Sequence, residues 1–328
     1  MFYIVKPNTS IDFVGKRKIW LGLSLVAILG TLVLFFTKGL NFGIDFTGGA
    51  EIQVKIPAKW GITELRSELS RGGIENPRVQ QLGEPGLNEY LIRVSASEEK
   101  LKQVSGQVQS VLSSNFEEGS YRILRADVVG PAAGSLLRQQ GFLAMLYALL
   151  VILVYVAIRF DSRYAPGAVI ALFHDSLIIL GIFMLTGRTF DLSILAAILA
   201  LIGYSNNDTI IVFDRVRETL QLHPEYSVEK AVNRAINETL GRTLVTSITT
   251  FIVVSALFFL GGETLKDFAF TLMCGVLIGT YSSVFIASSA IITLTHMRDR
   301  SQKKQAQQKS KSKKKKRYEV RPDPARGV

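Results

Sequence analysis

The chain has very few of the side chains from which disulfides and metal sites are built. Its 328 residues include one cysteine and three histidines. The single cysteine, Cys274, lies in an apolar segment and excludes a disulfide within the chain, so cysteine content says little about the compartment. No cluster of Cys and His has the spacing of metal ligands, and we therefore expect neither a metal nor another cofactor.

Acidic residues are fewer than basic ones, 27 against 38, and the formal net charge is +11. The excess is uneven, because much of it lies in a tail that reads RDRSQKKQAQQKSKSKKKKR over residues 298–317. A basic tail beside an apolar segment more often binds anionic lipid than nucleic acid. We expect contact with membrane lipid or another polyanion, or simple solvation, and no sequence-specific binding of nucleic acid.

Apolar residues, in contrast, are abundant, at 48% of the chain with a mean hydropathy of +0.27. A helix needs roughly 20 apolar residues to cross a bilayer. Six stretches approach or exceed this length: 19–36, 141–158, 166–187, 191–213, 243–262 and 268–295. The first follows a basic cluster, as a signal peptide does, but it is too long, and FFTKGLNFG offers no A-x-A cleavage site. We therefore expect an uncleaved anchor and six transmembrane helices.

Basic residues in the short connections predict the orientation, because they favour the cytoplasmic side. A basic cluster precedes the first span, and the basic tail follows the sixth. Five basic residues separate the fourth span from the fifth: Arg215, Arg217, Lys230, Arg234 and Arg242. The connections on the opposite side hold only Arg188 and Lys266. This pattern predicts that both termini are cytoplasmic and that the segment from about residue 38 to 138 lies outside.

The long connection between the first and second spans has the patterns of a small α+β domain. Strand patterns occur at 50–56, 78–83, 89–95 and 120–130, and helix patterns at 61–73 and 97–116. The order is β-α-β-β-α-β, as in a ferredoxin-like fold. This segment has no His, no Cys and no nucleophile elbow, so nothing in it indicates catalysis.

The expected fold class is a polytopic α-helical membrane protein with an outer α+β domain between helices 1 and 2. The chain divides into five parts: a cytoplasmic N-terminus (1–18), a first transmembrane helix (19–37), an extracytoplasmic ferredoxin-like domain (38–138), a bundle of the other five helices (139–297) and a basic cytoplasmic tail (298–328). The composition of the tail predicts disorder.

One apolar span carries an unusual run of polar residues. GYSNNDTIIVF (203–213) contains Asp208, and an unpaired carboxylate at the bilayer centre costs roughly 3 kcal/mol or more. Asp175 lies roughly 13 Å inside the third span and Asp208 roughly 10 Å from the same face. Arg242 enters the fifth span from that face. Three ionisable side chains can therefore meet at one depth, as buried charges in membranes usually do.

The residues around Asp208 form a polar turn that is too hydrophilic for packing alone: Ser205, Asn206, Asn207 and Thr209. This context favours a functional role for Asp208. A buried Asp–Arg pair can also simply fix the register of two helices, and Arg242 alone can be an ordinary arginine of the cytoplasmic edge.

Other polar or small residues in the spans have structural interpretations. We expect His174 to be a core histidine bonded to a carbonyl, and Asp191 to be the N-cap of the fourth span. Gly275 and Gly279 lie four residues apart on the sixth span, in the small-xxx-small pattern that lets two helices approach closely. We interpret both glycines as helix-packing residues.

Three long motifs follow one another along the chain: NFGIDFTGGAEIQV (41–54), GYSNNDTIIVFDRVRE (203–218) and NETLGRTLVTSITT (237–250). In sequence and order they resemble the SecF family, the smaller membrane subunit of the bacterial SecDF protein-export complex within the RND superfamily. The resemblance covers residues 1 to about 297, which is everything except the basic tail. The short outer segment and GIDFTGG favour SecF over its sister subunit SecD, whose outer domain is much larger.

The resemblance implies a multi-pass transport subunit of the inner (cytoplasmic) membrane, and not an enzyme. It implies that the chain works with SecD, after the SecYEG channel and the SecA motor, and uses the proton motive force to assist late steps in the translocation of an unfolded polypeptide. YidC and YajC are further implied partners. The resemblance also implies proton-pathway roles for Asp208 and Arg242, with Asp175 as a third candidate. Whether the coupling ion is a proton or sodium stays open.

A carboxylate switch is the mechanism that these residues suggest. Burial favours protonated Asp208, whereas an approaching Arg242 favours its charged form, so a helix movement that changes their distance links protonation to conformation.

Three other functions are alternatives for a chain with these spans and buried aspartates. A presenilin-like aspartyl protease would need YD and GxGD motifs, where this chain has FHD and GYSNND. A small-molecule exporter of the RND type would need larger outer lobes. A passive scaffold for the translocon would tolerate replacement of Asp208 and Arg242, but not of the packing glycines.

Overall fold

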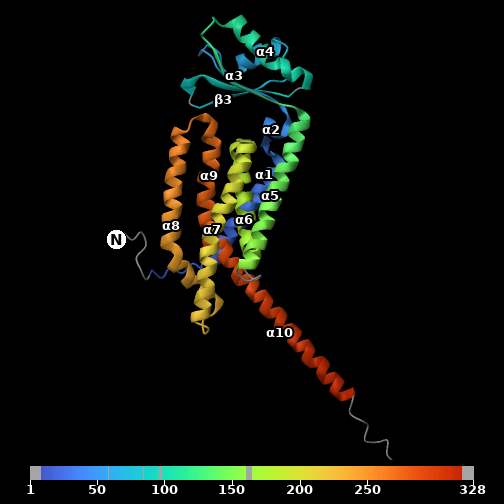
Figure 1. The fold of residues 1–328 in the computed structure, drawn as a ribbon, viewed down its shortest axis with the longest axis vertical. Helices are drawn as coiled ribbons and strands as arrows, with labels where there is room; N and C mark the ends of the chain where they lie inside the picture. Colours follow the sequence, from blue (N-terminus) through green and yellow to red (C-terminus); the bar gives the residue numbers. More distant parts are fainter. Residues whose placement is uncertain (1–8, 58, 84, 96–97, 160–164, 320–328) are drawn as a thin grey trace, which may run out of the picture.

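The computed structural model describes residues 9–57, 59–83, 85–95, 98–159 and 165–319, and it has two parts, a helical bundle and an α+β unit at one end of it (Figure 1). Among the described residues, six helices are long and apolar enough to cross a membrane. They are α1 (Arg17–Thr37), α5 (Pro131–Arg159), α6 (Ala165–Thr186), α7 (Leu192–Leu222), α8 (Val228–Leu260) and the helix that begins as α9 (Glu263–Ser282). The six spans predicted from hydropathy are therefore confirmed as apolar helices.

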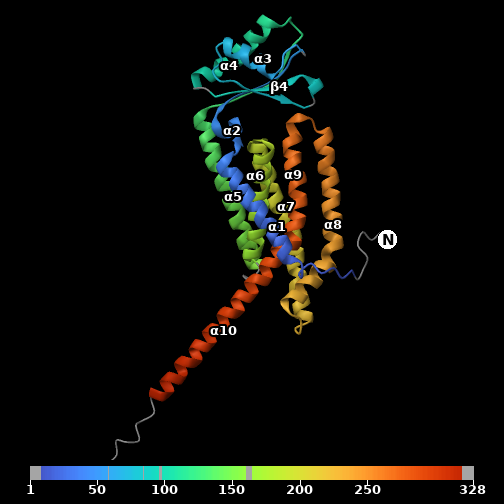
Figure 2. The same ribbon diagram turned by 180° about the vertical axis from the view of Figure 1, so that it is seen from behind.

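The sixth span continues without a break beyond the bundle. α9 passes through a π-helical turn, η2 (Ser283–Ala287), into α10 (Ser288–Glu319), which projects away from the other helices (Figures 1 and 2). Where the sequence predicts disorder from residue 298 onward, the structure has a helix as far as Glu319. Residues 301–317 contain no Pro or Gly and are rich in Lys and Gln, which are good helix formers.

The basic connection between the fourth and fifth spans forms a helical hairpin, because α7 and α8 both extend past their apolar parts. Ser227 caps the start of α8, where its side chain accepts a hydrogen bond from the backbone N–H of Lys230. Arg215 on α7 donates to Glu218 at 2.7 Å and also pairs with Glu238 on α8. The pair of Arg215 with Glu238 joins the two extensions.

The α+β unit is a four-stranded antiparallel sheet with two helices on one face. Its elements are β2 (Gly49–Lys55), α3 (Ile62–Arg71), β3 (Arg78–Leu82), β4 (Glu89–Val94), α4 (Glu98–Asn115) and β5 (Arg122–Val129), and a 3-10 turn, η1 (Pro85–Leu87), joins β3 to β4. The strands lie in the order β3-β4-β2-β5. All four strands and both helices lie within two residues of the ranges predicted from the sequence.

The core of this unit lies between the sheet and its helices. Ile52 and Ile92 from the sheet pack with Leu65 of α3 and Leu112 of α4, and all four side chains are fully buried. α3 and α4 cover the face that points away from the bundle, so the other face of the sheet turns toward the bundle (Figure 1).

The chain enters and leaves the α+β unit at one joint. β1 (Asn41–Phe42) pairs in parallel with β6 (Thr189–Phe190), and the short α2 (Ile44–Thr47) packs against α5. Gly48 has a φ of +72°, and a Cβ there would lie 2.7 Å from the Cα of Pro131. A Cβ on Gly134 would lie 2.6 Å from the backbone nitrogen of Gly48. Gly49 has a φ of +141°, and a Cβ there would lie 2.7 Å from the carbonyl oxygen of Val94. Only glycine permits these approaches, which explains the double glycine of the FTGG motif.

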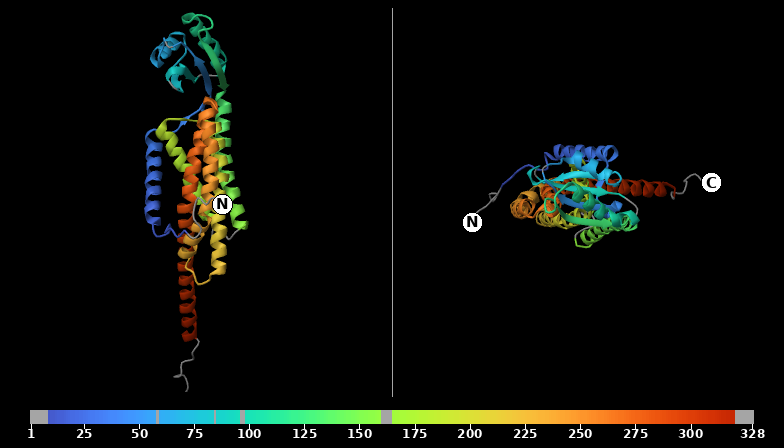
Figure 3. Two further views of the ribbon diagram at one scale, coloured as in Figure 1. Left: turned by 90° about the vertical axis from the view of Figure 1, so that its left-hand side faces the viewer. Right: turned by 90° about the horizontal axis from the view of Figure 1, so that it is seen from above.

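Three helices form the buried centre of the bundle. α6, α7 and α9 contact one another, while α1 lies along one side of the bundle against α6 (Figures 2 and 3). A Cβ on Gly275 of α9 would collide with the side chain of Leu201 on α7. A Cβ on Gly279 would lie 3.0 Å from the Cβ of Ser205. The two glycines thus lie where α9 meets α7 most closely.

We predict that Gly275→Ala destabilises the bundle by about 1–3 kcal/mol, because the added methyl group overpacks the α7–α9 contact. Gly203→Ala on α7 is the matched control, since a Cβ at Gly203 would meet nothing within 4 Å. Thermal unfolding of the two purified variants checks the difference. Equal melting temperatures would contradict the packing role of Gly275.

Candidate functional site

A buried carboxylate, Asp175, lies at the centre of the bundle. It is 6% exposed, and its Oδ2 accepts hydrogen bonds from Ser205 Oγ of α7 at 2.7 Å and from Ser282 Oγ of α9 at 2.8 Å. Its Oδ1 lies 2.9 Å from Nδ1 of His174. Asp175 is therefore the point at which α6, α7 and α9 are joined by side-chain hydrogen bonds.

The bonds continue from His174 to a fourth helix, α1. Nε2 of His174 lies 3.0 Å from Ser24 Oγ, which lies 2.8 Å from the hydroxyl of Tyr281 on α9. The Tyr281 hydroxyl donates to the backbone carbonyl of Trp20 at 2.7 Å. A chain of hydrogen bonds thus runs from Asp175 through His174, Ser24 and Tyr281 to the backbone of α1.

These contacts correct one prediction and extend another. The ring of His174 is buried in the core, but both its nitrogens contact side chains and not a carbonyl as predicted. The sequence singled out Asp175, but it did not place Ser24, Tyr281 or Ser282 beside it. A lone Ser or Tyr in an apolar span gives no local signal, since its partner here is more than 100 residues away along the chain.

Asp208 lies on the buried face of α7, three residues after Ser205, and is 2% exposed. Among the described residues, no hydrogen bond or ion pair joins its carboxylate to Asp175 or to Arg242. Arg242 is the charged group that acts on Asp208 at longer range. Asp175 and Asp208 thus lie in one helix core with different surroundings, because three side chains bond Asp175 and Arg242 acts on Asp208 only at longer range.

The polar turn around Asp208 is divided among several roles. Ser205 belongs to the Asp175 contacts, and Thr209 donates to the carbonyl of Ser205 in its own helix. Asn206 is buried with its Oδ1 unpaired, whereas Asn207 is exposed on the other side of α7. On α8 the hydroxyl of Thr243, next to Arg242, is also buried and unpaired.

Arg242 lies in a groove at the end of the bundle that carries the helical hairpin. The groove has a volume of about 440 Å³ and includes Tyr155, Glu238 and Ile211. Ile211 follows Asp208 by three residues, which is about 4.5 Å along the helix axis. The groove therefore reaches to within one helical turn of the buried carboxylate.

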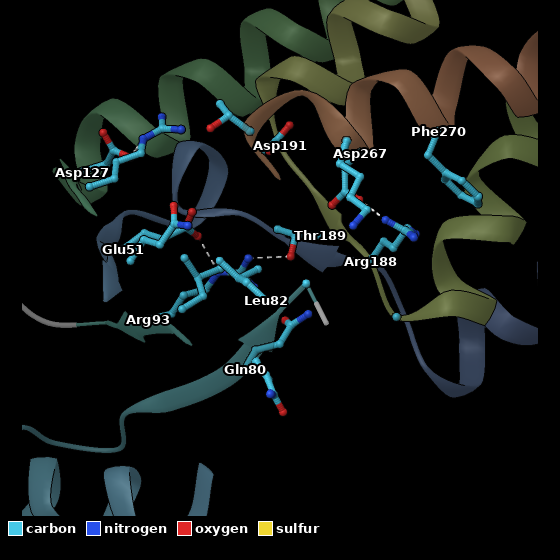
Figure 4. A pocket seen from close by; sticks show the side chains of 18 of the residues that line it. Glu51, Gln80, Leu82, Arg93, Asp127, Arg188, Thr189, Asp191, Asp267 and Phe270 are labelled. Carbon is cyan, nitrogen blue, oxygen red and sulfur yellow. Dashed lines mark hydrogen bonds and ion pairs between the residues drawn. The ribbon is translucent and has the colours of Figure 1, made fainter. Parts of the chain in front are cut away.

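A second, larger pocket lies at the opposite end, between the open face of the sheet and the outer ends of α6, α7 and α9 (Figure 4). Its volume is about 590 Å³. Arg93 of β4 donates to Glu51 and, through a terminal nitrogen, to Thr189 Oγ1 of β6, both at 2.6 Å. Arg93 thus ties the α+β unit to the bundle.

The bundle side of this pocket is also charged. Arg188 pairs with Asp267 and lies over the ring of Phe270 at 4.2 Å (Figure 4). Asp191 caps α7 as predicted, accepting from the N–H of Ile194 at 3.0 Å. Burial raises the pKa of Asp191, the nearby carboxylates of Asp45 and Asp267 add to the rise, and the backbone hydrogen bonds oppose it. No group of three or more His, Cys, Asp or Glu that could hold a metal occurs within the described ranges.

Comparison with known proteins identifies the family. The model of the C-terminal part of the protein export membrane protein SecD/SecF matches residues 107–297, and the model of the SecD/SecF GG motif matches residues 33–56. The protein translocase subunit SecF of Calditerrivibrio nitroreducens is 41% identical over 300 residues, which cover 90% of this chain and 98% of that protein. SecF of Pseudomonas aeruginosa is 38% identical over 286 residues, covering 87% and 92%.

Solved structures agree with the sequence comparison. The crystal structure of SecDF, a translocon-associated membrane protein from Thermus thermophilus, superposes with a TM-score of 0.81 at 32% identity over 90% of this chain. This chain spans only 40% of that SecDF chain. The super-membrane-facing form of SecDF gives a TM-score of 0.67 over 93% of this chain. Because the match in sequence and structure extends over most of its length, the chain belongs to the SecF family of protein translocase subunits.

Proposed function

We propose that this chain is the SecF subunit of a SecDF complex in the inner membrane, and that the complex uses the proton motive force to assist late polypeptide translocation. The similar SecDF chain is more than twice as long as the part that this protein matches, and SecD would supply the remainder. In this proposal the complex acts after SecYEG and SecA, with YidC and YajC as further partners.

The α+β unit is, in this proposal, a ferredoxin-like domain on the outer side of the membrane. Its strand order β3-β4-β2-β5, with helices after the first and third strands, is that of the split βαβ fold. The excess of Lys and Arg at the opposite end of the bundle supports an outer position for this unit and cytoplasmic termini.

The observation that carries the proposal is the burial of Asp208 within a membrane helix. A carboxylate that is 2% exposed there needs a functional reason, because hydrocarbon solvates charge poorly. The unpaired atoms of Asn206 and Thr243 are groups that water can satisfy, and the groove beside Arg242 offers a route from the cytoplasmic end. We assign the proton pathway to Asp208, Arg242 and Asp175.

Movement of α8 relative to α7 would couple this pathway to conformation. Arg242 lies on α8 and Asp208 on α7, so a change in their separation changes how strongly the guanidinium favours the carboxylate. One charge that crosses a potential of 100 mV supplies about 2.3 kcal/mol. This energy can shift a two-state equilibrium about 50-fold, which is enough to bias the outer unit between two orientations.

We predict that Asp208→Asn abolishes the stimulation of export by a proton gradient in membrane vesicles, since an amide binds no proton in the working pH range. Allosteric couplings of 1–3 kcal/mol correspond to losses of about 5–150-fold. The measurement is the amount of a secretory protein imported by inverted vesicles with and without the gradient. Asp208→Glu, which keeps a carboxylate, is measured in the same way.

The control for this prediction is Asp299→Asn, which removes an exposed carboxylate near the end of the sixth span. This control should export like the parent. Wild-type stimulation in Asp208→Asn would rule out the proton pathway and favour a passive scaffold. Scanning pH and sodium separately in the same assay identifies the coupling ion.

We also predict the orientation, which the single cysteine makes simple to test. In a Cys274→Ala background, Ser113→Cys on α4 should react with an impermeant maleimide in intact spheroplasts. Ser301→Cys on α10 should react only after the membrane is opened. Both serines are exposed. Labelling of Ser301→Cys in intact spheroplasts would reverse the proposed orientation.

A further inference from the structure

The direction of the hydrogen bonds between Asp175 and α1 is set at the α1 end. The Trp20 carbonyl can only accept, so the hydroxyl of Tyr281 donates to it. Tyr281 must then accept from Ser24, and Ser24 must in turn accept from Nε2 of His174. The structure therefore assigns a hydrogen to Nε2 of His174.

The other end of the chain then requires one more proton. Both serine hydroxyls donate to Oδ2 of Asp175, which leaves Oδ1 facing Nδ1 of His174 at 2.9 Å. With a hydrogen on Nε2, a neutral ring has a bare lone pair at Nδ1. The contact is attractive only when a proton lies between them, either on Oδ1 with a neutral ring or on Nδ1 with a charged ring.

We propose that the His174–Asp175 pair holds one exchangeable proton, and that release of this proton reverses the hydrogen-bond chain that ends at Trp20. This inference rests on the proposed function only for what the proton is used for. The presence of the proton follows from the hydrogen bonds alone. The three side chains at its centre are deeply buried: Ser24 is 5%, His174 3% and Asp175 6% exposed.

The proton balance of the reversal is complete. Asp175 gives its proton to Nδ1 of His174, and Nε2 gives its hydrogen to the oxygen of Ser24. Ser24 gives its hydrogen to the oxygen of Tyr281, whose own proton passes to solvent water. One proton has then left, and the pair has changed from neutral to a net charge of −1. Every remaining bond now points toward Asp175.

Reversal changes the contact between α1 and α9. Once Tyr281 donates to Ser24, the Trp20 carbonyl has lost its side-chain donor. The ring of Trp20 stacks on Phe285 with centroids 4.5 Å apart and meets the edge of Tyr281 at 5.9 Å. Trp20 therefore reports on the protonation of a pair that it does not touch.

Ionisable groups on the packed helices must be separated from this pair in any test. They are Tyr281 on α9, Asp208 one turn from Ser205 on α7, and Arg17 one turn before Trp20 on α1. Tyr281 is itself a member of the hydrogen-bond chain, and Arg17 lies outside it. Asp208 is the group that needs a control variant.

Fluorescence of Trp20 in the full chain tests the proposal. The chain has two tryptophans, so Trp60→Phe leaves Trp20 as the only tryptophan. In nanodiscs, its emission maximum should shift with pH. Asp175→Asn in the same background should lose this shift while retaining the fold. Its amide can donate to His174 and accept from both serines, so it mimics the protonated state.

Two further variants separate the steps. Ser24→Ala breaks the link to α1, so the Trp20 shift should be lost while the infrared C=O band of protonated Asp175 still responds to pH. Asp208→Asn should retain the Trp20 shift even though it lacks proton-dependent export. A pH-independent Trp20 emission in the Trp60→Phe protein, or a shift that persists in Asp175→Asn, would overturn the proposal.

These outcomes also distinguish the two proposals. Normal export by Asp208→Asn would refute the proposed function and leave the Trp20 result standing. An unresponsive Trp20 would refute the exchangeable proton and leave the Asp208 result standing.

Discussion

The absence of water from the hydrocarbon core is the constraint on which this structure depends. A polar side chain in the bundle is costly unless a protein group or trapped water satisfies it, and a carboxylate needs several such partners. Asp175 meets this demand with a histidine and two serines from three helices. The glycines at 275 and 279 remove the side chains that would keep α9 from approaching α7. The close packing of α9 against α7 and the hydrogen bonds of Asp175 therefore depend on each other.

Asp208 lies in the same core under different conditions. Asp175 has all its nearest partners fixed by short hydrogen bonds, whereas Asp208 has unpaired polar neighbours and a guanidinium at a distance. A fully bonded site rigidifies its surroundings, and a partly bonded site can respond to a change in charge or water. The two carboxylates thus meet the same constraint in different ways, Asp175 within a closed set of side-chain hydrogen bonds in which a proton can move, and Asp208 within a partly bonded region.

Much of the fold could be predicted because its signals are local. Apolar runs predicted the spans, alternation predicted the four strands, and an Asp before an apolar run predicted the N-cap at 191. The contacts of Asp175 could not be predicted, because Ser24 and Tyr281 are common residues whose partners come from distant helices. The extended helices after residues 213 and 297 were missed for another reason. These segments are charged and have no apolar face, so a prediction based on apolar residues does not detect them.

The junction between β5 and α5 has a mechanical consequence. A single residue, Gly130, separates the end of the strand at Val129 from the start of the helix at Pro131, and Gly48 of the FTGG motif lies against the same point. Such a short connection couples a rotation of the helix to a rotation of the sheet. If α5 tilts or turns in the bilayer, the sheet must swing with it, because little slack is available to absorb the motion. A movement of α5 within the membrane would then displace the α+β unit, and the displacement would increase with distance from the joint.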